Sequence, residues 1–416
     1  MAQPTNILEQ VITYQMSGLA YLQNLYCFIG TANTKFKDFD RLTANLGQTV
    51  SFDLAPRFQV TNSLVATFQG ADQKVQNLTV DQQASVAFAF TAQQFIYNVR
   101  NYMEKFGKSA IEELGARIEA QVANNCVTAP YRFYGDGVTP INSYQQLAAA
   151  LAQFRTYGAA KGQTKAYIQD LAVPNIVNSG LAQFAEYRNN ETAKSWELGP
   201  FSRCDWYQSN LLPIHTAGTE GQQGSTLTVV SFTTNGTNGA IDTITFSGTH
   251  AATDPNSVLQ YDKFQFQDGV SGQTNLRFRT FIGHEVSGSP VQFQAIANAA
   301  STGGSQVTVT ISPQLQSGPT MDQNINTPIV AGQQVKVLPS HRAGMITSGD
   351  PLFLAMPTLP EEVPYPTSAK FDDETGVSLR QYYGSLFGQN QRGMIYDCIW
   401  GSTVVPEYSM SLIFPL

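Results

Sequence analysis

The sequence of 416 residues is poor in charge, because Asp, Glu, Lys and Arg make up only 13% of it. Soluble domains usually devote roughly a quarter of their residues to these four types. Gln, Asn, Ser, Thr and Gly take the places that charge usually occupies. This composition is typical either of a β-rich protein with uncharged polar faces or of a subunit largely covered by other subunits, since interface cores are depleted in charge.

Basic residues are also in the minority: 24 Lys and Arg stand against 31 Asp and Glu, and the net charge is −7. A dedicated nucleic-acid-binding protein normally presents a basic face to the phosphates. The charge balance therefore argues against that class of protein.

Cysteine is scarce, and the four residues Cys27, Cys126, Cys204 and Cys398 form no CxxC pair. We therefore expect buried free thiols rather than structural zinc or a disulfide framework. The N-terminus has no basic segment followed by an apolar core, and no apolar run approaches the ~20 residues of a membrane span. These absences predict a soluble protein made in a reducing cytoplasm, without membrane contact.

Histidine is rare too, and none of the four residues has a carboxylate or cysteine at metal-ligand spacing. We expect all four to lie in turns or at the surface: His215, His250, His284 and His341. The HExxH, GxSxG, GxxxxGK[ST] and GxGxxG motifs are absent. The Tyr-Gly-Asp-Gly segment at 134–137 lacks the other carboxylates of a calcium loop, so it predicts a turn. We expect no enzyme, no catalytic residues, no metal and no cofactor.

Two segments place apolar residues at helical spacing. Residues 6–30 do so ahead of any compact pattern, which favours an N-terminal arm. The strongest helix is predicted over 99–127, where a stripe at i+4 steps is widened by Met103 and Ile111. The stripe consists of Phe106, Ala110, Leu114, Ile118, Val122 and Cys126.

A mixed pattern follows this helix. A capping box at 142–146 predicts a helix running to Phe154. A strand is predicted over 165–173, and Pro174 then opens a short helix. This helix–strand–helix order is typical of an α/β domain.

Three regions alternate with the period of strands. Residues 50–54 and 86–90, separated by a polar turn near 69–72, predict a long two-stranded excursion that needs a partner surface. Residues 217–338 are rich in Gly, Thr, Ser and Asn, and predict a small antiparallel barrel or sandwich inserted into a host domain. Its strands are expected at 226–232, 242–246, 264–266, 277–281, 291–297, 307–311 and 335–338. The tail predicts strands at 394–399, 403–405 and 409–414, the last tied into a sheet.

Several of these segments, taken in order, resemble one family. Residues 47–52 and 56–58 look like the ascending strand of its extended loop, and 75–83 and 86–91 look like the descending strand. The segments 261–266, 293–297, 303–313 and 324–328 are similar to its inserted barrel, and 340–344 to the return from it. Residues 392–401 and 405–407 resemble its closing strand pair. The family is the tailed-bacteriophage major capsid (coat) proteins of the Hong Kong 97 fold, and the nearest resemblance is to the Salmonella short-tailed-phage branch.

The resemblance implies an α+β fold with an axial domain, a peripheral domain with a long spine helix, an extended loop, an N-terminal arm and an inserted antiparallel barrel. The implied boundaries follow the chain: arm 1–35, extended loop and peripheral strands 36–98, spine helix 99–128, first axial part 129–216, barrel 217–338, and second axial part with the closing strands 339–416. The function implied is a structural one: self-assembly into the icosahedral head that encloses double-stranded phage DNA. Hexamers and pentamers of the chain, a scaffolding protein and a portal would be its partners. The virion would be its location, after assembly in the host cytoplasm.

Assembly would bury apolar area of the arm and loop on neighbouring copies. The expected anchors lie on the loop strands: Phe52, Pro56, Arg57, Phe58, Phe88 and Phe90. Basic residues of the long helix could contact DNA weakly, although an ordinary solvated face explains them too. These residues are Arg100, Lys105, Lys108 and Arg117.

Some family members cross-link their shells between a lysine and an asparagine. Residues 47–80 offer only Lys74, with Asn62 and Asn77 nearby, and no recognisable partner set, so we expect a non-covalent shell. Two other classes stay open as alternatives. A β-rich phage adhesin or carbohydrate-binding module would account for the Gly-, Thr- and Asn-rich stretch, and a hydrolase is disfavoured by the missing catalytic motifs.

Overall fold

The computed structural model describes residues 27–34, 49–54, 58, 74–91, 107–158, 162–179, 202–236, 238–271, 273–318, 320–360, 367–372, 377–386 and 391–416. The chain is of mixed α and β structure and divides into two compact units. The first unit consists of Met1–Phe52, Val75–Cys126 and Asp350–Val404, and the second of Asp53–Lys74, Val127–Gly349 and Val405–Leu416. Most of the predicted N-terminal arm lies outside the described residues, which begin with the short helix α2 (Cys27–Thr31).

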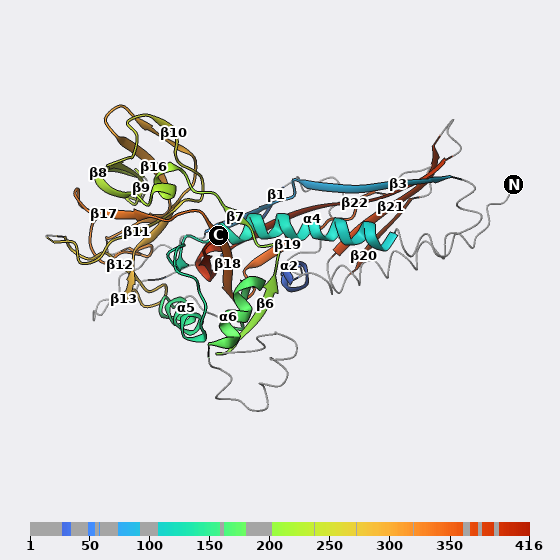
Figure 1. Cartoon of the computed structure of the whole chain (residues 1–416), viewed down its shortest axis with the longest axis horizontal. Helices are drawn as coiled ribbons and strands as arrows, with labels where there is room; N and C mark the ends of the chain where they lie inside the picture. The colour runs from blue at the N-terminus through green and yellow to red at the C-terminus, as the bar shows by residue number, and fades with distance from the viewer. Residues whose placement is uncertain are drawn as a thin grey trace. The chain divides into compact units, whose positions relative to one another are not determined.

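The first unit is built on an antiparallel five-stranded sheet (Figure 1). Its centre is the long strand β22, which pairs with β21 and β3 along its first part and with β19 along its last part. The prediction of separate strands at 394–399 and 403–405 was therefore wrong, because β22 continues through both. The strands are β3 (Gln82–Thr91), β19 (Leu352–Ala355), β20 (Thr367–Asp372), β21 (Val377–Leu386) and β22 (Gln391–Val404).

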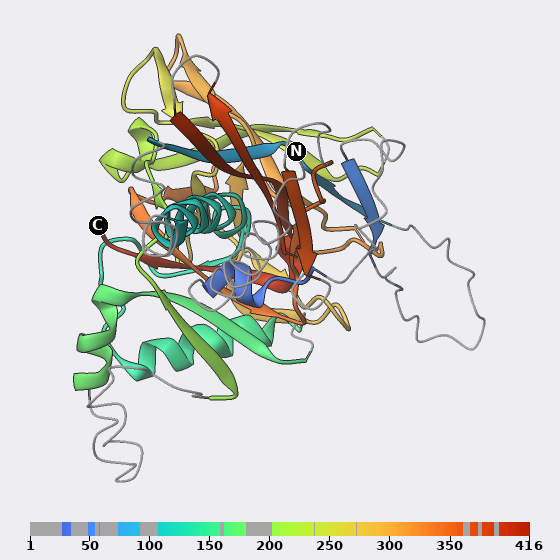
Figure 2. The same ribbon diagram turned by 90° about the vertical axis from the view of Figure 1, so that its right-hand side faces the viewer.

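A long helix, α4 (Lys108–Val127), lies beside this sheet; Figure 2 views it nearly end-on next to the strands. The predicted apolar stripe is confirmed for Ala110, Leu114, Ile118, Val122 and Cys126, all of which are buried. Residues 99–106 of the predicted helix lie outside the described part of the chain. A helix of this length packs through its apolar face, and that stripe supplies the face.

The predicted two-stranded excursion is present, and its first strand pairs with the segment that the family resemblance gave as the start of the descending strand. Strand β1 (Thr49–Asp53) pairs with β2 (Val75–Thr79), not with residues 86–90. Residues 86–90 belong to β3, which runs antiparallel to β22. Alternation gave the strands correctly, but pairing is decided by long-range contacts that a local pattern does not contain.

The second unit contains a mixed six-stranded sheet in the order β4-β23-β18-β5-β6, with β7 also paired to β18. Helices α5 (Tyr144–Thr156) and α6 (Val173–Asn178) share a hydrophobic core with it, in which Leu151, Phe154 and Ile176 are fully buried. The predicted α/β character and the embedded final strand are thus confirmed. The strands are β4 (Phe133–Tyr134), β5 (Thr164–Gln169), β6 (Cys204–Ser209), β7 (Ile214–His215), β18 (His341–Ser348) and β23 (Ser409–Phe414).

Local signals set the ends of these elements. Ser143 is the N-cap of α5, and its Oγ accepts a hydrogen bond from the Gln146 backbone N–H at 3.3 Å, as the capping box predicts. Strand β5 is shorter than predicted, because the 3-10 turn η3 (Asp170–Ala172) precedes α6. The 134–137 segment is a turn, in which Asp136 accepts from the backbone N–H groups of Val138 and Thr139.

A closed barrel forms the rest of the second unit. Six strands follow one another in the order β16-β14-β11-β17-β8-β9, and the pairing of β9 with β16 closes the ring. Closure removes the exposed edges that an open sheet would leave. The strands are β8 (Thr226–Thr234), β9 (Ile241–Ser247), β11 (Lys263–Phe266), β14 (Gln292–Ala295), β16 (Gln306–Leu315) and β17 (Gln334–Val337). The predicted barrel is confirmed at these strands.

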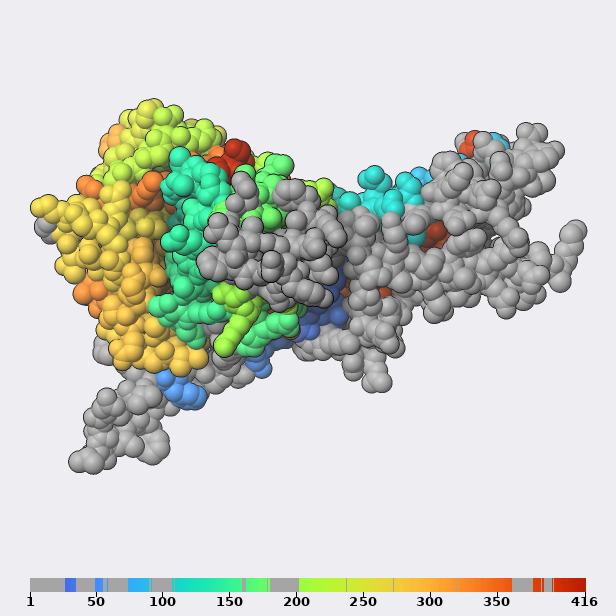
Figure 3. Space-filling view, turned by 60° about the horizontal axis from the view of Figure 1, so that its bottom comes forward, coloured from blue at the N-terminus to red at the C-terminus, as the bar shows by residue number. Residues whose placement is uncertain are grey.

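Flanking elements that periodicity missed complete the barrel region: α8 (Thr219–Gln223), β10 (Asp254–Val258), β13 (Val286–Pro290) and β15 (Ala299–Thr302). Strand β13 pairs with the predicted β12 (Arg277–Arg279), and β15 joins β10 to β16. The space-filling view shows the yellow and orange barrel residues packed together (Figure 3). The chain leaves the six-stranded sheet at β7 and re-enters it at β18, where His215 and His341 are register partners.

Candidate assembly elements and a buried polar junction

The aromatic residues predicted as anchors are partly used inside the chain. Phe52 is half-buried, and its ring centroid lies 4.4 Å from that of Phe353. Phe88 is also half-buried, with its ring centroid 6.2 Å from that of Tyr396. Phe58 is 60% exposed and so presents an apolar ring to the surroundings. Pro56, Arg57 and the Phe90 side chain lie outside the described residues, so their anchor role stays a prediction.

The β1–β2 pair is held by few buried side chains. Val50 and Leu78 contribute its core together with Ala355, while the other side chains of both strands are exposed or half-buried. Polar cross-strand contacts add to the pairing: Ser51 Oγ donates to Asn77 Oδ1 at 2.8 Å. Among the described strands, β1 and β2 pair only with each other.

The basic residues predicted on the long helix are described in part. Arg117 is exposed on α4. Arg100, Lys105 and the side chain of Lys108 lie outside the described residues. The possible contact of this set with DNA therefore remains a prediction.

Glu119, on the same helix, holds α2 in place. It is 1% exposed, and its carboxylate accepts hydrogen bonds from the backbone N–H groups of Phe28 and Ile29 at 2.8 and 3.1 Å. Burial raises the pKa of this carboxyl, while the backbone donors act in the opposite direction. Those donors are N–H groups in the first turn of α2, which have no acceptor within the helix, so the contact satisfies both partners.

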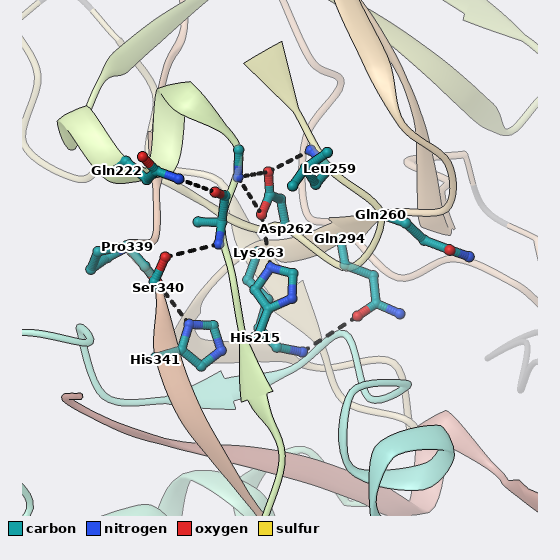
Figure 4. A network of polar contacts seen from close by, with 12 residues as sticks. His215, Gln222, Leu259, Gln260, Asp262, Lys263, Gln294, Pro339, Ser340 and His341 are labelled. Carbon is teal, nitrogen blue, oxygen red and sulfur yellow. Dashed lines mark hydrogen bonds and ion pairs between the residues drawn. The ribbon is translucent and has the colours of Figure 1, made fainter. Parts of the chain in front are cut away.

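A buried polar junction lies where the barrel meets the six-stranded sheet, and sequence reasoning missed it. Figure 4 shows Asp262 at its centre, fully buried. One carboxylate oxygen lies 2.8 Å from His215 Nε2, and the carboxylate also accepts from the backbone N–H groups of Gly218 and Leu259. The prediction of a turn or surface position was wrong for His215, which is 9% exposed. No local sequence pattern predicts the contact between His215 and Asp262, because the two residues are 47 positions apart in the chain.

His341 is the second histidine of the junction, and its predicted exposure was also wrong. Its side chain is fully buried, and its ring centroid lies 5.3 Å from that of His215. Nδ1 lies 2.8 Å from the Pro339 carbonyl oxygen, which requires this nitrogen to carry the proton. Burial lowers the pKa of His341 to about 3, with smaller contributions from Lys263 and His215. His284 lies in the connection between β12 and β13, as the turn prediction has it, and is 9% exposed.

Lys263 follows Asp262 and is buried at the start of β11. Its ammonium donates to the Pro130 carbonyl and lies 3.4 Å from Gln294 Oε1. Burial lowers its pKa to about 7. The junction therefore consists of hydrogen bonds that tie the barrel to the segments leaving and re-entering the sheet, which is a structural arrangement.

A second group of buried contacts lies between the barrel and the part of this unit that contains the six-stranded sheet. The Arg132 guanidinium lies 3.8 Å from the Tyr157 ring centroid, and its Nη2 donates to the carbonyl oxygens of Glu407 and Ser409. The hydroxyl oxygens of Tyr131 and Tyr157 are 3.1 Å apart. Both tyrosines belong to the barrel's hydrophobic core cluster, so the barrel is packed against residues that precede it in the chain.

The described residues contain no group of three or more His, Cys, Asp and Glu side chains that could hold a metal ion. None of the four cysteines forms a disulfide; Cys126, Cys204 and Cys398 are buried as predicted, whereas Cys27 is half-buried. Burial raises the pKa of each of these three thiols to about 12. Within the part of the chain that the structure describes, no helix is long and apolar enough to cross a membrane.

No protein-family model matches the chain, and no curated protein shows significant sequence similarity to it. Solved structures are similar at low identity. A structure of Mycobacterium phage Che8 has a TM-score of 0.47 and 8% identity, covering 93% of this chain and 90% of that chain. The capsid structure of the cyanophage P-SCSP1u has a TM-score of 0.42 and 9% identity, with coverages of 92% and 88%.

The capsid of Ralstonia phage GP4 gives similar values: a TM-score of 0.42, 9% identity, and coverage of 89% of this chain and 84% of that chain. TM-scores below 0.5 at this level of identity do not support an inference about function. Inferences on the function of this chain therefore rest on its own residues.

Proposed function

We propose that this chain is a structural subunit of a phage capsid, a role for which two of the solved structures above are examples. Copies of it would assemble into an icosahedral head around double-stranded DNA, with hexamers and pentamers as the units of the shell. A scaffolding protein and a portal would take part, and assembly in the host cytoplasm would place the chain in the virion. No catalytic step is part of this role.

The observation that carries the proposal is the β1–β2 pair. A two-stranded sheet is marginal in water without a packed face. Here one residue of each strand is buried, and the outer edges of both strands pair with no other described strand. Such an element gains stability when a neighbouring subunit covers it, because both apolar area and backbone hydrogen-bonding groups are then satisfied.

The composition supports the same role. Only 13% of the residues are charged, and a subunit covered on many sides needs little charge for solubility in the assembled state. Phe58 adds an exposed aromatic ring close in sequence to β1. Many weak contacts repeated by symmetry then produce a stable shell without a single tight interface.

The finer assignment is to the Hong Kong 97 fold with an inserted barrel domain. The order of elements supports it: the β1–β2 pair and β3 come first, then the long helix α4, the mixed sheet, the barrel and the closing strands. In this reading α4 is the spine helix, residues 217–338 are the inserted domain, and the β1–β2 pair is the base of the extended loop. The Salmonella short-tailed-phage branch is the nearest form, because it combines these parts.

The direct test is negative-stain electron microscopy of the full-length protein, expressed alone and then together with its phage's scaffolding protein. We expect closed shells or curved shell fragments of uniform subunit spacing. A chain that stays monomeric at high concentration under both conditions would rule out the capsid role.

The same particles test whether the shell is covalent. After boiling in detergent, we expect one band at the mass of a single chain on a denaturing gel. A ladder of linked subunits would contradict the non-covalent shell.

A further inference from the structure

The connection between β8 and β9 contains two Asn-Gly pairs, Asn235-Gly236 and Asn238-Gly239, and the chain has no other. Each pair is preceded by a threonine, so the two have the same local sequence. Asn-Gly is common in turns between antiparallel strands. It is also the pair at which asparagine loses its amide most readily, because glycine has no side chain to hinder attack by its own backbone nitrogen. The turn therefore allows the effect of structure on this reaction to be compared at two matched positions.

Deamidation of asparagine needs no enzyme. The backbone nitrogen of the following residue attacks the side-chain carbon Cγ, so that a bond from this nitrogen to Cγ forms and the Cγ–Nδ2 bond breaks. The amide nitrogen leaves as ammonia with the proton of the attacking nitrogen. Water then opens the cyclic imide at either of its carbonyl groups, which gives aspartate or isoaspartate. Water is the one co-reactant, and no group is oxidised or reduced.

Hydrogen bonds restrain both reacting groups of the second pair. The Gly239 N–H donates to the Asn235 carbonyl oxygen at 2.8 Å, so the attacking nitrogen is engaged. The Asn238 side chain is held at both of its polar atoms. Its Oδ1 accepts from the Ala240 N–H at 3.0 Å, and its Nδ2 donates to Gln314 Oε1 at 3.3 Å. Ring closure at Asn238 therefore requires the loss of three hydrogen bonds.

The attacking nitrogen of the first pair has more freedom. Among the described residues, no backbone carbonyl accepts a hydrogen bond from the Gly236 N–H. A Cβ atom built on Gly236 would meet nothing within 4 Å, so the peptide has open space in which to rotate. The contact from Gly239 restrains the Asn235 carbonyl oxygen, but it involves neither the Gly236 nitrogen nor the Asn235 side chain. Ring closure is therefore less hindered at Asn235 than at Asn238.

Exposure to solvent would favour the opposite order of reactivity. Asn238 is exposed, whereas Asn235 is half-buried. Water takes part only after the ring has closed and ammonia has left, however. Ring closure therefore determines which asparagine is consumed, and the hydrogen bonds act on that step. Because exposure and hydrogen bonding predict different sites, measurement of the two conversions distinguishes between them.

We propose that Asn235 is a site of spontaneous deamidation in the folded chain, and that hydrogen bonds protect Asn238 in the same turn. The conversion adds one negative charge to a chain whose net charge is already −7. In the isoaspartate product an additional backbone carbon separates residues 235 and 236. The turn then no longer matches the spacing between β8 and β9, so the end of this hairpin is loosened.

Mass spectrometry of the full-length protein tests the order of reactivity. The folded chain is incubated at mildly alkaline pH, where the backbone nitrogen attacks most readily. Each conversion raises the mass by about one dalton, and fragmentation of the peptide assigns it to one asparagine. We expect roughly tenfold or more conversion at Asn235 than at Asn238, because three hydrogen bonds protect the second site. Equal conversion at the two sites, or more at Asn238, would overturn the proposal.

The same chain unfolded in urea provides the control for local sequence. Both sites read Thr-Asn-Gly, so they should convert at similar rates once the turn is unfolded. This result would assign the difference in the folded chain to its structure. If Asn235 of the folded chain stayed intact for as long as the unfolded chain needs to convert completely, the fold would protect both sites and the proposal would fail.

Removal of one protective contact tests the cause. Gln314→Ala deletes the acceptor of the Asn238 side-chain amide and should raise conversion at Asn238 several-fold, while conversion at Asn235 stays the same. Gln306→Ala, on the same strand β16, is the matched control and should change neither site. Thermal melting checks that both variants fold. Unchanged conversion at Asn238 in Gln314→Ala would contradict protection by this hydrogen bond.

Discussion

At Gly401 the backbone of β22 lies very close to the backbone of Thr79 and Val80. A Cβ atom built on it would lie 2.2 Å from the Thr79 carbonyl oxygen and 2.8 Å from Val80 Cα. Both neighbours are backbone atoms, which cannot rotate away as the end of a side chain can. The absence of a side chain at Gly401 thus lets the end of β2 cross β22.

We predict that Gly401→Ala lowers the free energy of unfolding by roughly 1–3 kcal/mol or more, because the two strands must separate. Urea unfolding followed by circular dichroism measures the change. Gly384→Ala on β21 is the control, since a Cβ there meets nothing within 4 Å. An equal effect of the two substitutions would show that the contact with Thr79 does not decide the outcome.

The buried His341 makes the stability of the second unit depend on pH. Its pKa in the folded chain is lowered to about 3 from an ordinary value of 6.5. Above pH 6.5 both the folded and the unfolded chain hold it neutral. As the pH falls from 6.5 toward 3, the unfolded chain binds a proton that the folded chain does not, so stability is lost. His215, Asp262 and Lys263 are the ionisable groups that surround it.

We predict that His341→Asn loses less stability than the wild type between pH 7 and pH 4, by an amount on the order of a few kcal/mol. The amide can still donate to the Pro339 carbonyl but takes up no proton. Melting temperatures across this range give the comparison, with the exposed His250→Asn as control. Parallel curves for wild type and His341→Asn would contradict the assignment.

Among the elements, the β1–β2 pair is the one for which folding and assembly can be separated. The Leu54 N–H donates to the Lys74 carbonyl at 2.8 Å, so the strands are still adjacent at this point. A short Asn-Gly turn could therefore replace residues 55–73 without disturbing β1 or β2.

We predict that this replacement leaves a soluble subunit with a wild-type melting temperature but abolishes particles, because the removed segment would contact neighbouring copies. Sedimentation and negative-stain microscopy measure the assembly. Shells of normal size and yield would show that residues 55–73 are not an assembly element.

At the scale of the whole molecule, removal of the barrel tests what it contributes to the rest of its unit. His215 and His341 are register partners, so a few Gly and Ser residues could replace 217–338 and still close the chain. Two roles are to be distinguished: support of folding within the chain, or contact between capsomers. The burial of Tyr131 and Tyr157 in the barrel core favours the first.

We predict that excision of 217–338 produces a chain that aggregates or melts at a markedly lower temperature, because Tyr131 and Tyr157 lose the barrel residues that cover them. Size-exclusion chromatography and calorimetry give the result. A stable monomer that builds abnormal shells would assign the barrel to contacts between subunits alone.

Local patterns were enough for much of the fold. The apolar stripe of α4, the capping box of α5 and the six barrel strands each follow from residues close together in the chain, because helices and strands impose a fixed period on burial. The long loop strands were also found: alternation gave residues 50–54 and 86–90, and the family resemblance of residues 75–83 gave the partner of β1.

Long-range contacts decided the rest. The pairing of β1 with β2, the closure of the barrel by β9 and β16, and the continuous strand β22 depend on residues far apart in sequence. The same holds for Asp262 beside His215, for the buried His341, and for Glu119 on the start of α2. A histidine in a turn and a histidine in a core look alike in a sequence. Burial and pairing distinguish them, and both arise only when distant strands come together.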